Sequence, residues 1–164
     1  MNKPEKFILD ATAGFRMMWF NKQHPNALYI DERKEVNPDI VADYRNMKDF
    51  ADSSFQLIVW DPPHIIRKPY WDNTAEMEKN FGWLNFETWQ SDLKRGFAEL
   101  WRCLKPNGVL IFKWSEYSAT MKKVLKLFPI DPLFYQITAK KITSKKKESR
   151  TLWFCFMKIP EEKK

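Results

Sequence analysis

The chain has 164 residues, a net charge of +7 and a hydrophobic fraction of 44%. This length fits one compact domain, residues 1–164, and the apolar content excludes wholesale disorder. No apolar stretch reaches 18 residues, so no membrane span is expected. An excess of positive charge suits a polyanionic partner such as nucleic acid.

The first half of the chain alternates short apolar runs with polar turns. Apolar runs bounded by Gly, Pro, Asn or Asp indicate strands. After a turn at 12–14, residues 15–22 have the pattern of a helix, whereas 32–38 leave room only for a short helix or a loop. Four strands are predicted, at residues 7–9, 27–30, 39–42 and 55–60.

The second half begins with a long polar and aromatic connection over 65–83. Residues 86–104 predict a helix, because their apolar side chains recur every three or four positions and 105–108 hold the Pro and Gly that end it. Trp89, Phe97 and Trp101 are expected in the core. A strand is predicted at 109–114, a helix at 116–128, and an antiparallel hairpin at 135–143 and 151–158.

This order of elements predicts the fold class. Strands that alternate with helices favour an α/β fold with a parallel sheet and helices on both faces. The final hairpin adds two antiparallel strands. We therefore expect a mostly parallel, seven-stranded mixed sheet closed by an antiparallel hairpin.

Four acids follow the four predicted early strands: Asp10, Asp31, Asp43 and Asp61. The carboxyl ends of parallel strands meet at one edge of a sheet, where open α/β sheets bind ligands. Carboxylates gathered there repel one another unless a ligand places hydroxyls, amines or positive charge among them. Each acid alone has the simpler interpretation of a helix cap or turn former.

Two of these acids have the spacing of a nucleotide site. Asp31 follows Asp10 by about 20 residues, the separation at which an acid reaches a ribose in nucleotide-binding α/β units. Asp43 is then placed to accept a hydrogen bond from an adenine amino group, with Tyr44 or Met47 against the ring.

The strand at 55–60 ends in Asp61, Pro62, Pro63 and His64. Each proline fixes φ and removes a backbone donor, so the strand stops and the loop is stiff. The loop displays a carboxylate and the Asp61 and Pro62 carbonyls, all acceptors for an exocyclic amine, and His64 can lie against a planar ring. The alternative is an ordinary proline turn.

Two basic segments are candidates for phosphate contact. Lys145, Lys146 and Lys147 lie at the turn of the predicted hairpin, where they either bind phosphate or only aid solubility. Arg67 and Lys68 lie among aromatic residues in the 65–83 connection, which suits phosphate contact and base stacking. The alternative there is an ordinary loop that buries its aromatic side chains under the sheet edge. Trp114 and Ser115 are further candidates for the border of a substrate site.

The chain resembles the class I S-adenosylmethionine (SAM)-dependent methyltransferases, and among them the amino-methyltransferases such as DNA adenine N6-methyltransferases. The resemblance spans residues 6–158. Five motifs carry it: 8–14 (ILDATAG), 29–31 (YID), 41–43 (VAD), 61–64 (DPPH) and 104–111 (LKPNGVLI).

The resemblance implies a Rossmann-like methyltransferase fold, SAM as cofactor, and methyl transfer to an exocyclic amino nitrogen of a nucleic-acid base, adenine in DNA first. The implied catalytic residues are Asp61, Pro62, Pro63 and His64. The implied cofactor-binding residues are Asp10, Thr12, Gly14, Asp31, Asp43 and Tyr44. The family also makes RNA bases and protein amide nitrogens alternative substrates.

The chain departs from the family pattern at two places. Phe15 and Arg16 follow Gly14 where the family has further glycines, so a bulky ring lies near the expected methionine moiety. Arg16, at the start of the predicted helix, either holds the cofactor carboxylate or is an exposed helix arginine. His64 replaces a larger aromatic residue, so a smaller ring is available to stack on a base.

These departures keep a second class of function open: a catalytically inactive methyltransferase-fold subunit that binds nucleic acid or a partner. For an active enzyme, sequence specificity would come from the 65–83 connection, the basic hairpin, a homodimer mate or a separate specificity subunit. Cys103 and Cys155 lack metal-binding spacing, so no metal site is expected and both are assigned as reduced core thiols. The N-terminus leaves no room for a signal peptide's apolar region, and a cytoplasmic location is expected.

Overall fold

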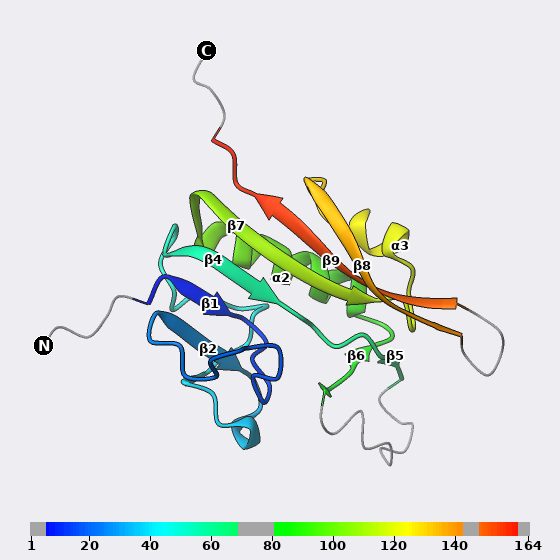
Figure 1. The fold of residues 1–164 in the computed structure, drawn as a ribbon, viewed down its shortest axis with the longest axis horizontal. Coiled ribbons are helices and arrows are strands. Elements are labelled where there is room, and N and C mark those ends of the chain that lie inside the picture. Colours follow the sequence, from blue (N-terminus) through cyan, green and yellow to red (C-terminus); the bar gives the residue numbers. More distant parts are fainter. Residues whose placement is uncertain (1–5, 69–80, 143–147, 161–164) are drawn as a thin grey trace, which may run out of the picture.

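The computed structural model describes residues 6–68, 81–142 and 148–160, with the backbone alone for 139–142 and 148–149. A seven-stranded sheet in the order β3-β2-β1-β4-β7-β9-β8 forms its centre (Figure 1). The strands are β1 (Ile8–Asp10), β2 (Ala27–Asp31), β3 (Ile40–Val41), β4 (Phe55–Trp60), β7 (Leu104–Ser115), β8 (Phe134–Ile142) and β9 (Glu148–Met157).

The sheet confirms the predicted α/β class. Strands β3, β2, β1, β4 and β7 are parallel, and β9 lies antiparallel between β7 and β8. The order reverses at β1, which pairs with both β2 and β4. At such a switch point the connections leave toward opposite sides and open a crevice beyond the strand ends.

The helix predicted at 86–104 is present as α2 (Trp89–Cys103), which lies behind the sheet in Figure 1. Its apolar face buries Leu93, Phe97 and Leu100 against the sheet, and Phe97 stacks on Phe128 with ring centroids 4.4 Å apart. Trp101 packs beside this core as a partly buried residue. A short 3₁₀ helix (Lys34–Val36) fills the connection expected to hold only a loop or short helix.

The helix predicted at 116–128 is mostly wrong, because only α3 (Met121–Leu125) forms. Tertiary contacts hold the preceding residues in a turn. The Glu116 carboxylate accepts hydrogen bonds from the Met121 backbone N–H at 2.9 Å and from Arg150 Nε at 2.6 Å. The Trp114 indole N–H donates to the Ala119 carbonyl at 2.9 Å.

The helix predicted at 15–22 is wrong, because residues 11–26 form a series of turns. Arg16 has φ of 55°, a left-handed value that interrupts a helix. Its guanidinium donates to Asp39, and Trp19 donates its indole N–H to Asp10 at 2.6 Å. These long-range contacts outweigh the local helical pattern.

The two faces of the sheet are consequently different. Residues Ile58, Trp60, Leu110 and Phe112 point to the face covered by α2 and are fully buried. In the described part of the chain both α-helices contribute to that same core, and the opposite face carries only the turns of 11–26 over β1 and β2. Among the described residues the helices therefore lie on one face, whereas helices on both faces were expected.

The second small sheet pairs β5 (Ile66–Arg67) with β6 (Leu84–Asn85) in parallel, beyond the end of β4. Among residues 6–68, 81–142 and 148–160, no helix is long and apolar enough to cross a membrane. No group of three or more His, Cys, Asp or Glu side chains is placed to hold a metal ion in this same part. Cys103 and Cys155 are free and buried.

Candidate functional site

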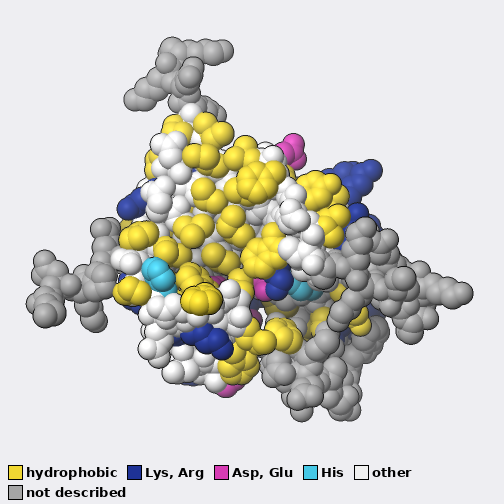
Figure 2. Space-filling view, viewed as in Figure 1, with side chains coloured by type: hydrophobic (Ala, Val, Ile, Leu, Met, Phe, Trp, Pro, Cys, Tyr) yellow, Lys and Arg dark blue, Asp and Glu magenta, His cyan; other side chains and the backbone are white. Residues whose placement is uncertain are grey.

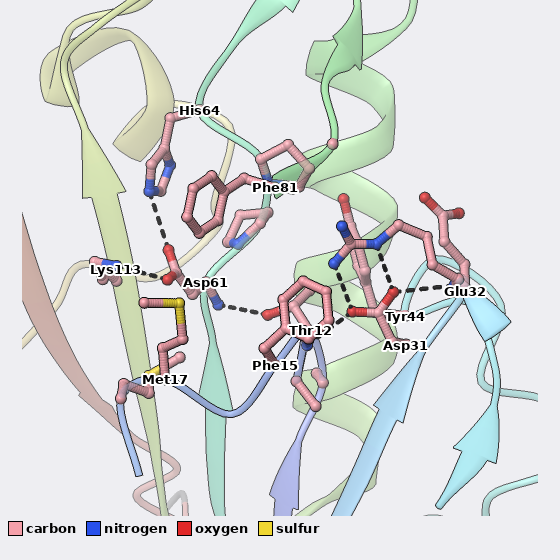
Figure 3. Close-up of a pocket in the computed structure, with 18 of the residues that line it drawn as sticks. Thr12, Phe15, Met17, Asp31, Glu32, Tyr44, Asp61, His64, Phe81 and Lys113 are labelled. Atoms are coloured by element: carbon pink, nitrogen blue, oxygen red, sulfur yellow. Dashed lines mark hydrogen bonds and ion pairs between the residues drawn. The ribbon is translucent and has the colours of Figure 1, made fainter. Parts of the chain in front are cut away.

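A cavity of about 600 Å³ opens at the carboxyl ends of β1, β2, β4 and β7, beside the switch point (Figure 3). Its walls combine acidic, basic and apolar side chains from segments far apart in sequence. The lining residues are Ala11, Thr12, Ala13, Gly14, Phe15, Met17, Met18, Asp31, Glu32, Arg33, Tyr44, Asp61, Pro62, Pro63, His64, Phe81, Gly82, Lys113, Ser115 and Thr151.

Asp61 is held from three directions at one end of this cavity (Figure 3). Its backbone N–H donates to Thr12 Oγ1 at 2.8 Å. Its Oδ2 accepts from Lys113 Nζ at 2.6 Å, and its Oδ1 lies 3.0 Å from His64 Nε2. Burial alone would raise the pKa of Asp61, but His64 and Lys113 outweigh burial and lower that pKa. The carboxylate is therefore fixed in position and ionised.

His64 lies between Asp61 and Trp114. The imidazole is edge-on to the Trp114 ring, with centroids 5.1 Å apart. Its Nδ1 is buried and has no hydrogen-bond partner among the described residues. His64 thus contacts the carboxylate through Nε2 alone. Trp114 itself is fully buried and does not line the cavity, whereas Ser115 does.

The prolines of the loop are buttressed from the far side. A Cβ on Gly82 would lie 3.2 Å from Pro63 Cγ, and Gly82 has φ of 73°, so this position favours glycine. The pairing of β5 with β6 brings Gly82 to the loop, because Leu84, two residues later, pairs with Ile66. A stiff loop presents the Pro62 carbonyl at a fixed place.

Asp31 occupies the other end of the cavity and is almost fully buried. It accepts from the Gly14 backbone N–H at 2.9 Å and from Arg33 Nε and Nη2 at 2.9 and 3.0 Å. Burial would raise the pKa of Asp31, but the bonds from Arg33 and Gly14 lower it. An ionised acid therefore lies beside the turn at 12–14, with both of its oxygens accepting hydrogen bonds.

Tyr44 forms part of the wall between these ends. Its ring lies against Gly96 of α2, where an added Cβ would come within 2.6 Å of it. Its hydroxyl is buried without a hydrogen-bond partner in the described part of the chain. A buried polar atom of this kind is satisfied when a ligand supplies the partner.

Two of the acids singled out in the sequence are not in the cavity wall. Asp10 is fully buried below it, accepting from Trp19 and from the Thr12 backbone N–H at 3.2 Å. Burial raises the pKa of Asp10 to about 6, against hydrogen bonds that lower it. Asp43 turns to Arg45 Nε, 2.8 Å away. Asp10 thus supports the turn at 12–14 and Asp43 anchors a surface arginine.

The basic residues are placed less favourably for phosphate. Arg67 is only 4% exposed, with its guanidinium 4.1 Å from the Trp83 ring centroid. Lys68 is half-buried, with Nζ 5.9 Å from the Phe86 ring centroid. Arg16 stacks on Tyr29 and pairs with Asp39, away from the cavity. Lys145, Lys146 and Lys147 lie outside the described residues.

Sequence reasoning missed Arg33, Lys113 and the apolar wall formed by Met17 and Phe81. Lys113 had a signal, since it is a lone cation inside an otherwise apolar strand. Arg33 had a weaker signal, because it lies two residues after Asp31, the acid of the ribose-binding pattern. Met17 had none, because a helical interpretation of 15–22 gave no reason to place it at the site.

No protein-family model and no curated protein sequence matches this chain. Among solved structures, a SAM-dependent methyltransferase from Methanosarcina mazei superposes with a TM-score of 0.58 and 13% identity, over 98% of this chain and 95% of that one. A geranyl diphosphate methyltransferase, solved with GPP and sinefungin, gives a TM-score of 0.54 and 9% identity, over 97% and 73%. At these identities the likeness concerns the fold, and this chain has the fold of SAM-dependent methyltransferases.

Proposed function

We propose that this chain is a SAM-dependent N-methyltransferase that acts on an exocyclic amino nitrogen of a nucleic-acid base. Adenine in DNA is the first candidate substrate. The observation that carries the proposal is the shared cavity of two ionised acids. Asp31 lies at its cofactor end and Asp61, within a rigid Asp-Pro-Pro loop, lies at its reacting end. Each of the two structural neighbours is named as a methyltransferase, and one was solved with sinefungin.

The cavity suits SAM in size and in chemistry. Its volume of about 600 Å³ is within the range of small-molecule sites. Asp31 and Glu32 offer acceptors for ribose hydroxyls, and the orphaned Tyr44 hydroxyl offers a further polar contact. Bound there, SAM would supply an electrophilic methyl group on a sulfonium.

Asp61 and Pro62 would prepare the nitrogen that receives this methyl group. An amino group conjugated to a base is a poor nucleophile, because its lone pair is delocalised into the ring. The Asp61 carboxylate and the Pro62 carbonyl accept its two hydrogens, which draws the nitrogen toward a tetrahedral geometry. The ionised carboxylate also stabilises the positive charge that develops on nitrogen.

His64 is the proposed acceptor of the proton that the methylated nitrogen must lose. As the new N–C bond forms, the electrons of the broken S–C bond remain on sulfur and the nitrogen carries one proton too many. Because His64 Nε2 faces the Asp61 carboxylate at 3.0 Å, the ring nitrogen proposed to accept this proton is Nδ1, which has no hydrogen-bond partner among the described residues.

A nucleic-acid substrate is supported by charge and by the apolar wall. The net charge of +7 favours a polyanion. Phe15 and Phe81 line the cavity and are 48% and 54% exposed, so their rings are open to a base that enters. A base must leave its stack to reach Asp61, and aromatic faces compensate part of the lost stacking.

One observation favours a second candidate, an inactive methyltransferase-fold subunit. Both acids are already paired, Asp31 with Arg33 and Asp61 with Lys113. A ligand therefore has to share or displace these cations. The intact Asp-Pro-Pro loop has no role in a subunit without chemistry, and we place the enzyme first.

The test has two stages. Calorimetric titration of the purified chain with SAM measures binding, and transfer of labelled methyl from SAM to pools of DNA, RNA and protein measures activity. We expect binding in the wild type and in Asp61→Asn, and transfer to DNA in the wild type only. Asp131→Asn, an exposed acid away from the cavity, is the matched control and should retain both. A folded wild type that fails to bind SAM overturns the proposal.

A further inference from the structure

One face of the sheet is apolar and open. By strand register, Leu57 and Val59 of β4 align with Val109 and Ile111 of β7, which align with Met157 and Cys155 of β9. These side chains share the face opposite α2. Figure 2 shows hydrophobic side chains spread over this face, which no helix of the described part of the chain covers.

This face is almost free of charge, although 30% of the chain is charged. Trp153 and Phe134 continue the apolar surface across β9 and β8. Among its strand positions, Lys113 is a cation that Asp61 already pairs with, and Lys141, opposite Ser149, is a cation at the far end of β8. Apolar surface left in water is unfavourable in proportion to its area, so a second surface on this face would stabilise the fold.

The open face and the turns beside it together provide apolar surface for a dimer. Four strands spaced about 4.8 Å apart, each with about seven residues at ~3.3 Å, span on the order of 450 Å² in plan. Side chains that project from the sheet add to this area. Met17 and Phe20, which are 70% and 108% exposed on the adjoining turns, add to it as well. A stable interface takes about 800 Å² from each partner, so the sheet in plan supplies about half, and the projecting side chains and adjoining turns must supply the rest.

We propose that two copies of this chain pack these open faces against each other as an isologous dimer. The Lys113–Asp61 ion pair is neutral as a unit, so a two-fold axis can bring two copies of the apolar patch together without opposing that lysine by an unpaired like charge. The apolar patch also offers no charge pattern by which an unlike partner would be selected. Two twisted sheets packed face to face form a common layer about 10 Å thick, which suits side chains of this size.

The interface borders the cavity. Ser115 and Thr151 line the cavity and pair with each other at the end of β7 and β9, on the same face as the patch. The second copy therefore lies beside the cavity's open side. The dimer does not depend on methyl transfer, so its test stands apart from the test of activity.

The test is the mass in solution, by sedimentation equilibrium at physiological salt over a dilution series from micromolar to hundreds of micromolar. We expect twice the 19.8 kDa of one chain. Phe134→Lys and Met157→Lys place a charge at the patch, and each should give a monomer. Val41→Lys, at an apolar residue 48% exposed on the opposite edge of the sheet, is the matched control and should remain dimeric.

Hydroxyl-radical footprinting locates the interface. Trp153 and Met157 should be protected in the wild-type dimer and oxidised in monomeric Phe134→Lys, with circular dichroism showing that both are folded. A monomeric wild type at the highest concentration overturns the proposal. So does a dimer that survives both patch variants, or one in which Trp153 and Met157 are oxidised as fast as in the monomer.

Discussion

Lys113 Nζ lies 2.6 Å from Asp61 Oδ2, and the register of two neighbouring strands sets this ion pair. Trp60 of β4 pairs with Phe112 of β7, so the next residue of each strand, Asp61 and Lys113, emerges at the same level. The lysine opposes the effect of burial and lowers the pKa of Asp61. The strand beside the Asp-Pro-Pro loop thus helps to lower the pKa of the acid in that loop.

Lys113→Met should move the acid limb of the pH–rate profile for methyl transfer to higher pH. The methionine keeps the aliphatic length but removes the charge, so burial, which raises the pKa of Asp61, is opposed by His64 alone. The ionised form is then lost at higher pH, and activity falls more at acid than at neutral pH. The measurement is kcat/KM for labelled-methyl transfer across the pH range.

Lys105→Met, at the other end of the same strand, is the control and should leave the profile unchanged. An unchanged profile in Lys113→Met, with activity retained, would show that the lysine does not set the ionisation of Asp61. Loss of activity at every pH without a shift would instead point to a role in positioning.

Asp31→Asn should weaken SAM binding, and Asp43→Asn should not. Asp31 lines the cavity and keeps its charge, whereas Asp43 lies outside the wall and pairs with Arg45. A hydrogen bond to a charged group contributes about 1.5–3 kcal/mol, so the Asp31 variant should bind roughly tenfold to a hundredfold more weakly. Calorimetric titration with SAM measures both. Equal losses of SAM affinity in the two variants would indicate that Asp43 also contributes to the cofactor site.

The strands were predictable because their signal is local. A short apolar run between turn residues gives β2 and β4 within one residue of their observed bounds, without knowledge of what they pair with. The helix at 86–104 is similar, since its apolar stripe is long enough to outweigh its surroundings. The order of four acids at one sheet edge followed from these strands alone.

The structure of residues 15–22 and the set of acids that line the cavity depended on tertiary contacts, which a local sequence pattern does not contain. Residues 15–22 lose their helix to the Arg16–Asp39 and Trp19–Asp10 contacts, each across a different part of the fold. Which acids reach the cavity depends on the direction of each side chain. Asp10 points under the turns of 11–26, where Trp19 binds it, while Asp31 points to the cavity, although both end a strand.

Gly96→Ala should destabilise the chain and weaken ligand binding. Alanine in a helix interior normally stabilises by about 1 kcal/mol relative to glycine. Here the new Cβ would lie 2.6 Å from the Tyr44 ring and 3.1 Å from Trp60, so Tyr44 must leave the cavity wall. Overpacking of this kind costs about 1–3 kcal/mol. Urea unfolding measures the loss, with Lys94→Ala on the exposed side of α2 as the control. If Gly96→Ala is more stable than the wild type, the Tyr44 ring can move away from the new Cβ without a loss of stability.

The raised pKa of Asp10 predicts how the free energy of unfolding depends on pH. Burial raises its pKa from 3.8 to about 6 in the folded chain, so between these values the folded state binds more protons than the unfolded state. Stability contributed at this site is then present below pH 3.8 and is lost as pH rises through about 6. A shift of this size is worth about 3 kcal/mol at most.

Asp10→Asn removes this titration while keeping an oxygen that accepts a hydrogen bond. The free energy of unfolding of wild type minus that of Asp10→Asn should therefore decrease, by up to about 3 kcal/mol, as pH rises from about 4 to 7. Taking the difference cancels any constant loss from the bonds to Trp19 and Thr12. Urea unfolding at a series of pH values measures it. A difference that stays level over this range would mean that Asp10 is ionised in the folded chain at pH 4, and that the hydrogen bonds outweigh its burial.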